Sequence, residues 1–260
     1  MPSQVKVKNL DGIKSDFLRL KNIKVESNSS KTIFNNELSD DTLNLVLEEN
    51  SMCTYITFDN GLNENGSNNN MCATLSKDAT LKIYNIITSD KNANIKAHID
   101  LNEQGANVEV INLLLLTKNA SLDSFIDIYH HVKNTSSDLS NYAIAKDEAT
   151  ITLNNNATIK TKASKSIAHQ QTKGLTLSKK TKIKALPNLY IDEYDVVANH
   201  ACSIGSVSKD DLFYLMSRGL SEAEASKIVV MGYVKPILDH IDDVTIKEEV
   251  EKEFAKKLID

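Results

Sequence analysis

Short runs of alternating apolar and polar residues recur along the chain, each preceded by a polar pair and a small residue. The clearest runs cover residues 78–83, 92–97 and 105–110. Alternation with a period of two is typical of strands that have one apolar and one polar face. The small residues recur at intervals of 13 or 14 residues, at Ala79, Ala93, Ala106 and Ala120, and the unit returns at Ala149 and Ala157.

Such units cannot bury an apolar face alone, so a regular recurrence predicts coils that stack into a solenoid with a shared core. We predict a mainly β protein with a β-helix core over residues 71–205, preceded by a β-rich segment over residues 1–70. That segment ends in an asparagine-rich polar loop over residues 60–70. A β-sandwich also has alternating strands at short intervals, but recurrence of the small residue favours the solenoid.

Residues 206–260 follow a different pattern, which predicts a C-terminal helical subdomain of three short helices. Helix starts are indicated at Ser208, Ser221 and Thr245, the last two with a glutamate three residues later, as in a capping box. In the second helix, the apolar stripe is expected to contain Ala225, Ile228 and Val229. These helices are expected to cap the open end of the solenoid or to dock a partner.

Composition excludes several classes of function. The chain of 260 residues has 30 basic and 35 acidic residues and no long basic run, so we expect no nucleic-acid partner. No apolar stretch reaches the ~20 residues of a membrane helix, and the first residues lack the apolar segment of a signal peptide. We therefore expect a cytoplasmic protein without a membrane partner. Three unpaired cysteines, Cys53, Cys72 and Cys202, predict reduced thiols.

No nucleotide-binding glycine loop and no common catalytic motif is present, so we expect neither an enzyme nor a bound nucleotide. Adjacent His130 and His131 would face opposite sides of a strand and could not chelate one ion together. His200 and Cys202 are two residues apart, so on a strand their side chains would point the same way. They offer an imidazole nitrogen and a thiolate as metal ligands.

Two ligands do not make a site. An iron–sulfur cluster is usually held by about four donors, so His200 and Cys202 could form half of a site that another chain completes. The alternative is a hydrogen-bonded edge histidine beside a buried thiol.

Three segments together resemble a known family. They are Leu186–Val196, Asn199–Gly205 and Leu212–Gly219, which resemble the SufB/SufD core pattern P-x-L-x-I, S-H-G-x-x-x-G and F-Y-L-x-S-R-G. The resemblance covers about residues 75–240. Ala201 stands where SufB-like members carry glutamate and SufD-like members a small residue, so the chain looks SufD-like.

The resemblance implies a right-handed parallel β-helix with helical ends. It further implies a non-catalytic scaffold subunit that pairs with a SufB-like paralogue and docks a SufC-like ATPase in the SUF system. An iron–sulfur cluster would form transiently at the junction of the two solenoids, with His200 and Cys202 as ligands. Contact with the SufC-like partner would involve Phe213, Tyr214, Leu215, Arg218 and Gly219.

Three alternatives remain open at this point. The chain could be a SufB-like or homodimeric scaffold, or a β-solenoid interaction module without a role in cluster assembly. A polysaccharide-acting β-helix is disfavoured, because acidic residues are scattered along the sequence rather than clustered.

Overall fold

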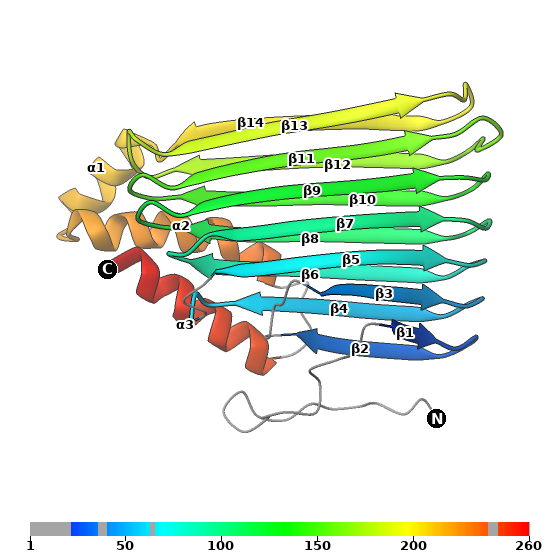
Figure 1. Ribbon diagram of the computed structural model, residues 1–260. Coiled ribbons are helices and arrows are strands. Elements are labelled where there is room, and N and C mark those ends of the chain that lie inside the picture. Colours follow the sequence, from blue (N-terminus) through cyan, green and yellow to red (C-terminus); the bar gives the residue numbers. More distant parts are fainter. Residues whose placement is uncertain (1–21, 36–40, 63–65, 239–243, 260) are drawn as a thin grey trace.

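The computed structural model describes residues 22–35, 41–62, 66–238 and 244–259, which form two seven-stranded sheets and three helices. Strands alternate between the sheets along the chain (Figure 1). One sheet contains β1 (Asn22–Val25), β3 (Thr42–Leu47), β5 (Ser67–Leu75), β7 (Ala93–Leu101), β9 (Ser121–His130), β11 (Thr150–Ile159) and β13 (Lys182–Ile191). The other contains β2 (Ser30–Asn35), β4 (Met52–Asp59), β6 (Thr80–Ser89), β8 (Asn107–Leu116), β10 (Ser136–Ala145), β12 (Ile167–Thr176) and β14 (Val197–Ser206).

All strand pairs are parallel, and each strand pairs with the strand two elements away, such as β10 with β8 and β12. One coil of the chain therefore adds one strand to each sheet. This confirms the predicted parallel β-helix. The β-sandwich alternative is wrong, because consecutive strands belong to opposite sheets.

The core lies between the two sheets and is built from the inward residues of each strand. The predicted inward residues Leu81, Ile83, Val108 and Val110 are all at most 2% exposed. The recurring alanines are buried beside the corners that separate consecutive strands, so the interval of 13 or 14 residues is half of one coil.

A column of polar side chains runs through this core along the even-numbered sheet. Asn85 Nδ2 donates to Asn112 Oδ1 at 2.8 Å, and Asn112 Nδ2 donates to Asn141 Oδ1 at 2.6 Å. Asn141 Nδ2 in turn donates to Thr172 Oγ1 at 3.1 Å. Because each buried amide is paired with the next coil, the column fixes the register of the coils without leaving these polar groups unsatisfied.

One corner of the solenoid is a stack of tight turns. Five successive coils place a left-handed residue there, namely Asn28, Asn50, Asp78, Gly105 and Asn134. The backbone N–H of Asn50 donates to Lys77 O at 2.8 Å in the next coil, and similar bonds join the others. Asparagine and aspartate tolerate this conformation. At Gly105, which has a φ of 81°, a Cβ atom would lie 1.9 Å from Asp78 Oδ1, so a larger residue would have to displace the Asp78 side chain.

Neither sheet is interrupted near residue 70, because β5 pairs with both β3 and β7. The predicted polar loop is shorter than expected, since β5 begins at Ser67. Asn69 stabilises this polar strand from inside the core, donating to Thr57 Oγ1 at 3.1 Å and to Asn85 Oδ1 at 2.8 Å. Residues 1–21 and 63–65 of the predicted N-terminal segment lie outside the described residues.

The C-terminal helices are α1 (Lys209–Ser217), α2 (Glu222–Leu238) and α3 (Val244–Ile259). Ser208 caps α1, and Ser221 and Glu224 form the predicted capping box of α2, with Glu224 N donating to Ser221 Oγ at 3.3 Å. The predicted start of α3 is slightly late, because Thr245 lies inside the helix that begins at Val244.

Helices α2 and α3 cover the outer face of the even-numbered sheet (Figure 1). The buried residues of α2 include Val230, Val234 and Ile237, whereas Ile228 is 49% exposed. The predicted stripe is therefore wrong for Ile228. The contact is apolar on both sides, since Phe58, Ile86 and Leu113 of the sheet pack in one cluster with Phe254 and Leu258 of α3.

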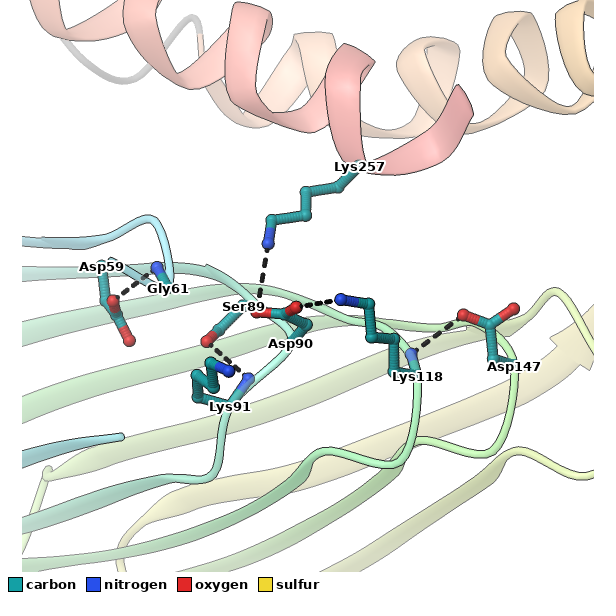
Figure 2. A network of polar contacts seen from close by, with 8 residues as sticks. All are labelled: Asp59, Gly61, Ser89, Asp90, Lys91, Lys118, Asp147 and Lys257. Carbon is teal, nitrogen blue, oxygen red and sulfur yellow. Dashed lines mark hydrogen bonds and ion pairs between the residues drawn. The ribbon is translucent and has the colours of Figure 1, made fainter. Parts of the chain in front are cut away.

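A polar contact fastens the end of α3 to a corner of the solenoid (Figure 2). Lys257 Nζ lies 3.4 Å from Asp90 Oδ1, while Lys118 Nζ lies 2.5 Å from Asp90 Oδ2. These two ammonium groups lower the pKa of Asp90 to about 2, Lys118 having the larger effect. Lys146 Nζ also donates to the last carbonyls of α3, those of Lys257 and Leu258, at 3.4 Å each.

Candidate functional site

His200 and Cys202 lie in the middle of β14, the last strand of the even-numbered sheet. β14 pairs only with β12, where His200 is opposite Gln170 and Cys202 is opposite Thr172. Its other edge has no strand neighbour within the described residues. The predicted pair therefore occupies the open end of the solenoid (Figure 1).

Both side chains share the face of β14 that points toward the interior between the sheets. A Cβ atom on inward-facing Gly174 would lie 2.9 Å from Ile204 Cγ1, so Ile204 extends over the interior of the previous coil. Alternation places Cys202 and His200 on the same face as Ile204. Because no further coil covers β14 in the described chain, both residues are nevertheless exposed.

This exposure does not match the alternative of a hydrogen-bonded histidine beside a buried thiol, while the ligand role of the pair stays a prediction. Cys202 is an exposed free thiol, so the prediction of a buried thiol is wrong. No hydrogen bond to the His200 side chain is formed by any of the residues that the structure describes, and His200 is not a satisfied edge histidine. The described part of the chain also contains no group of three or more His, Cys, Asp or Glu placed to hold a metal. Any cluster here would need donors from elsewhere.

The other two cysteines offer no second site of this kind. Cys53 is fully buried in the core, and burial raises the pKa of its thiol to about 12. Cys72 is exposed on β5, in the other sheet.

His130 and His131 separate as predicted. His130 is fully buried, with Nδ1 2.8 Å from Thr135 Oγ1 and Nε2 2.9 Å from Ser137 Oγ. His131 instead reaches the outside, with Nε2 2.6 Å from Asp100 Oδ1. The two rings therefore belong to different environments and do not form a chelating pair.

Sequence analysis missed a polar cluster on the outer face of the odd-numbered sheet. His98 Nε2 lies 3.2 Å from Asp100 Oδ2, on the other side of the carboxylate from His131. The Tyr129 ring lies 5.0 Å from the His98 ring and 6.0 Å from the His131 ring. The spacing of His98 and Asp100, two residues apart on one strand, is the signal that could have found it. We interpret the cluster as a structural feature of that face.

The predicted partner-contact residues lie on and just after α1, which has no buried residue. Phe213 is 75% and Tyr214 57% exposed, and the Arg218 guanidinium lies 5.2 Å from the Tyr214 ring. Leu215 is half-buried, and Gly219 ends the helix with a φ of 96°. This helix thus presents aromatic side chains to the outside, as docking would require.

Apolar side chains are concentrated at the same end of the described molecule. Over half of its exposed large hydrophobic residues fall in one short stretch of sequence, namely Tyr190, Ile191, Tyr194, Val197, Ile204, Phe213, Tyr214 and Met216. We call these eight residues the terminal group. Its first members lie where β13 turns into β14, and its last members lie on α1, beyond the other end of β14 (Figure 1).

The two free strand edges at this end differ. β13 carries Lys182, Lys184 and Pro187, which are features that keep an edge from pairing with another strand. β14 contains neither proline nor a charged residue over its ten residues. The edge that carries His200 is therefore the one suited to pair with a strand of another molecule.

Between α2 and α3 lies an open groove of about 650 Å³. Apolar residues and a mixed set of charges line it, namely Leu220, Ile228, Met231 and Ala255 with Glu224, Lys227, Lys235, Glu248, Glu251 and Lys252. No helix in the described ranges is long and apolar enough to cross a membrane.

The fold and its last coil define a class of protein: a parallel β-solenoid with a helical layer and an exposed histidine–cysteine pair on a terminal strand whose outer edge has no strand neighbour in the described chain. Residues 20–233 match the family described as "SUF system FeS cluster assembly, SufBD core domain". The chain belongs to this SufB/SufD family and is a SufD-like member.

Individual relatives agree with this assignment. The chain is 34% identical over 131 residues to the iron-sulfur cluster assembly protein SufD of Bacillus subtilis, which is 50% of this chain and 30% of that protein. It is 31% identical over 107 residues to SufB of the same organism, covering 41% of this chain and 23% of that protein. With SufD of Plasmodium falciparum the match is 40% over 72 residues, 27% of this chain and 5% of the relative. The matched segments thus span less than a third of these relatives.

Proposed function

We propose that this chain is a non-catalytic scaffold subunit of SUF iron–sulfur cluster assembly. It pairs through β14 with a SufB-like subunit, or with a second copy of itself, and docks a SufC-like ATPase on its helical subdomain. A cluster forms transiently at the junction as cargo, and the chain itself binds no nucleotide. The observation that carries the proposal is the position of His200 and Cys202 on an exposed strand that has no charged residue and whose outer edge has no strand neighbour among the described residues.

The chemistry of the pair fits iron. A neutral imidazole and a thiolate are both ligands for iron and for iron–sulfur clusters. Because a cluster needs about four donors, the remaining ligands come from the partner that faces β14. The exposed position of His200 and Cys202 leaves room for those ligands.

Two other exposed surfaces near β14 support the proposal. Four exposed apolar residues of β13 and β14, namely Tyr190, Ile191, Val197 and Ile204, supply apolar side chains for the paired subunit. The aromatic face of α1, with Phe213, Tyr214 and Arg218, is directed outward for the ATPase. In this proposal, assembly takes place in the cytoplasm.

Pairing is tested first, by co-purification with a SufB-like and a SufC-like protein. Ile204→Lys places a charge on the inward face of the terminal strand and is expected to abolish retention of the SufB-like partner. Phe125→Lys is the matched control, because Phe125 is 42% and Ile204 41% exposed and Phe125 lies on the other sheet. Equal retention by both variants would argue against pairing through β14.

Cluster formation is tested by anaerobic reconstitution of the purified complex. His200→Ala is expected to lower the cluster yield several-fold while partner binding persists, and His98→Ala, at another exposed histidine, is expected to leave the yield unchanged. A complex of His200→Ala with full yield would remove the ligand role. Failure of the wild-type chain to bind either partner would favour a general interaction module.

A further inference from the structure

Gln170, in the middle of β12, is a buried polar residue directly below the candidate ligand. It is 4% exposed, and it is the strand neighbour of His200 in β14. Its Nε2 donates to the backbone carbonyl of Asn188 in β13 at 3.2 Å. Its Oε1 is buried and has no hydrogen-bond partner among the described residues.

The contact with Asn188 fixes which way the Gln170 amide faces. A carbonyl oxygen can only accept, so the amide nitrogen must point toward Asn188 and the amide oxygen away from it. A buried acceptor left without a donor costs about 1–3 kcal/mol. Gln170 Oε1 therefore provides a strongly favoured position for an N–H or O–H donor.

Of the two strands that pair with β12 in the described chain, only β14 places such a donor opposite Gln170. On one side Gln170 is paired with Leu139, which is fully buried and apolar. On the other side it is paired with His200, whose imidazole carries an N–H group. His200 is exposed, so its ring can turn, whereas Gln170 is enclosed by the core and held by Asn188.

We propose that Gln170 is a positioning residue for His200. When the His200 ring turns inward, one ring N–H donates to Gln170 Oε1, and the other ring nitrogen keeps its lone pair and points out of the open end. Metal-binding histidines are commonly oriented by such a second hydrogen bond. The resulting arrangement presents one defined nitrogen to an incoming iron. The benefit to iron binding rests on the proposed function, but the hydrogen bond itself does not.

The hydrogen bond is tested in the isolated, full-length chain by ¹H–¹⁵N NMR of histidine ring protons, at a pH of about 8.5, above the ordinary histidine range. The wild-type chain is expected to show a slowly exchanging ring N–H signal that disappears in His200→Gln. Gln170→Met, which keeps the length and removes the acceptor, is expected to lose the same signal. Asn155→Leu is the control and is expected to keep the signal. Asn155 is another buried amide without a hydrogen-bond partner among the described residues, but its neighbour on the adjacent strand is Pro187 instead of His200.

A wild-type chain without this signal, or a Gln170→Met chain that retains it, would overturn the proposal. If Gln170→Met does not fold, Gln170→Leu replaces it, since leucine also lacks the acceptor oxygen. In the reconstituted complex, loss of an orienting bond is expected to weaken iron retention by about 10-fold or more. If Gln170→Met loses the NMR signal but retains iron as the wild type does, the hydrogen bond exists but does not position His200 for iron, whereas the ligand role itself is tested separately by His200→Ala.

Discussion

The buried histidine His130 predicts how the stability of the solenoid depends on pH. It ends β9, has no exposed surface, and has both ring nitrogens within 2.9 Å of hydroxyl oxygens of Thr135 and Ser137. Burial, assisted by the adjacent His131, lowers its pKa from 6.5 to about 4. The folded protein therefore holds His130 neutral under conditions in which the unfolded chain binds a proton.

The sign and size of the effect follow from this difference. Because the pKa is lower in the folded state, the contribution to stability is complete above about 6.5, the value in the unfolded chain, and is lost as the pH falls through about 4. One pKa unit corresponds to about 1.4 kcal/mol, so the total loss is about 3 kcal/mol. Asp90 does not interfere, because its pKa is lowered from 3.8 to about 2 and acts at lower pH.

Urea unfolding at several pH values between 8 and 4 measures this loss. Wild-type protein is expected to lose about 3 kcal/mol more over this range than His130→Gln, whose amide can still bond both hydroxyls but does not titrate. His98→Gln, at an exposed histidine, serves as the control and is expected to follow the wild type. Parallel curves for wild type and His130→Gln would refute the assignment of this pH dependence to His130.

Three further substitutions test the packing of the fold. Asp90→Asn removes the anion between Lys118 and Lys257, so unfolding titrations at pH 7 should show a loss of about 1 kcal/mol, and the wild-type decrease between about pH 4 and 2 should shrink. Phe254→Ala leaves a cavity between α3 and the sheet and should cost about 3–5 kcal/mol in thermal or urea unfolding; a cost below about 1 kcal/mol would contradict the observed burial. Asn155→Leu removes two unpaired buried polar atoms and should raise the unfolding free energy by about 1 kcal/mol; a decrease would show that both atoms are paired in solution.

The sequence predicts the solenoid because each coil must meet the same requirements: an apolar inner face on each strand and a tight turn at each corner. Alternation fixes which side chains enter the core, and a small buried residue such as Ala106 recurs beside many of the corners. Asparagine is common because it serves two purposes, left-handed turns at residues such as Asn134 and the buried column that contains Asn112. Asparagine-rich segments such as residues 67–70 therefore look like loops in the sequence but form a strand.

Helix packing was harder to predict, because it depends on a surface formed by distant coils. Runs such as Val110–Leu116 are apolar on nearly every position, which is typical of a strand covered on both faces. That signal indicates a covered outer face but not which helix covers it. The predicted apolar stripe of α2 was wrong for this reason. Val230 and Ile228 are both apolar, and the sequence alone does not indicate that Val230 faces the sheet and Ile228 faces outward.

The candidate site was predictable only in part. The spacing of His200 and Cys202 places them on one face, but whether that face points inward or outward depends on the register with β12. Gln170 could not be connected to His200 at all, because the residues that separate them in sequence form a complete coil. Contacts between coils depend on the number of residues in each corner, and that number varies.

The helical layer has a consequence for motion within the solenoid. Coils in a stack contact only their neighbours, so in general they can unfold one at a time from an end. The apolar cluster under α2 and α3 joins residues of β4, β6, β8 and β10, and thus links those coils into one cooperative unit. β14 lies beyond the buried part of that cluster. Hydrogen exchange should therefore be slow in β4, β6, β8 and β10 and fast in β14. The strand that carries His200 can thus adjust its conformation to a partner while the rest of the scaffold stays folded.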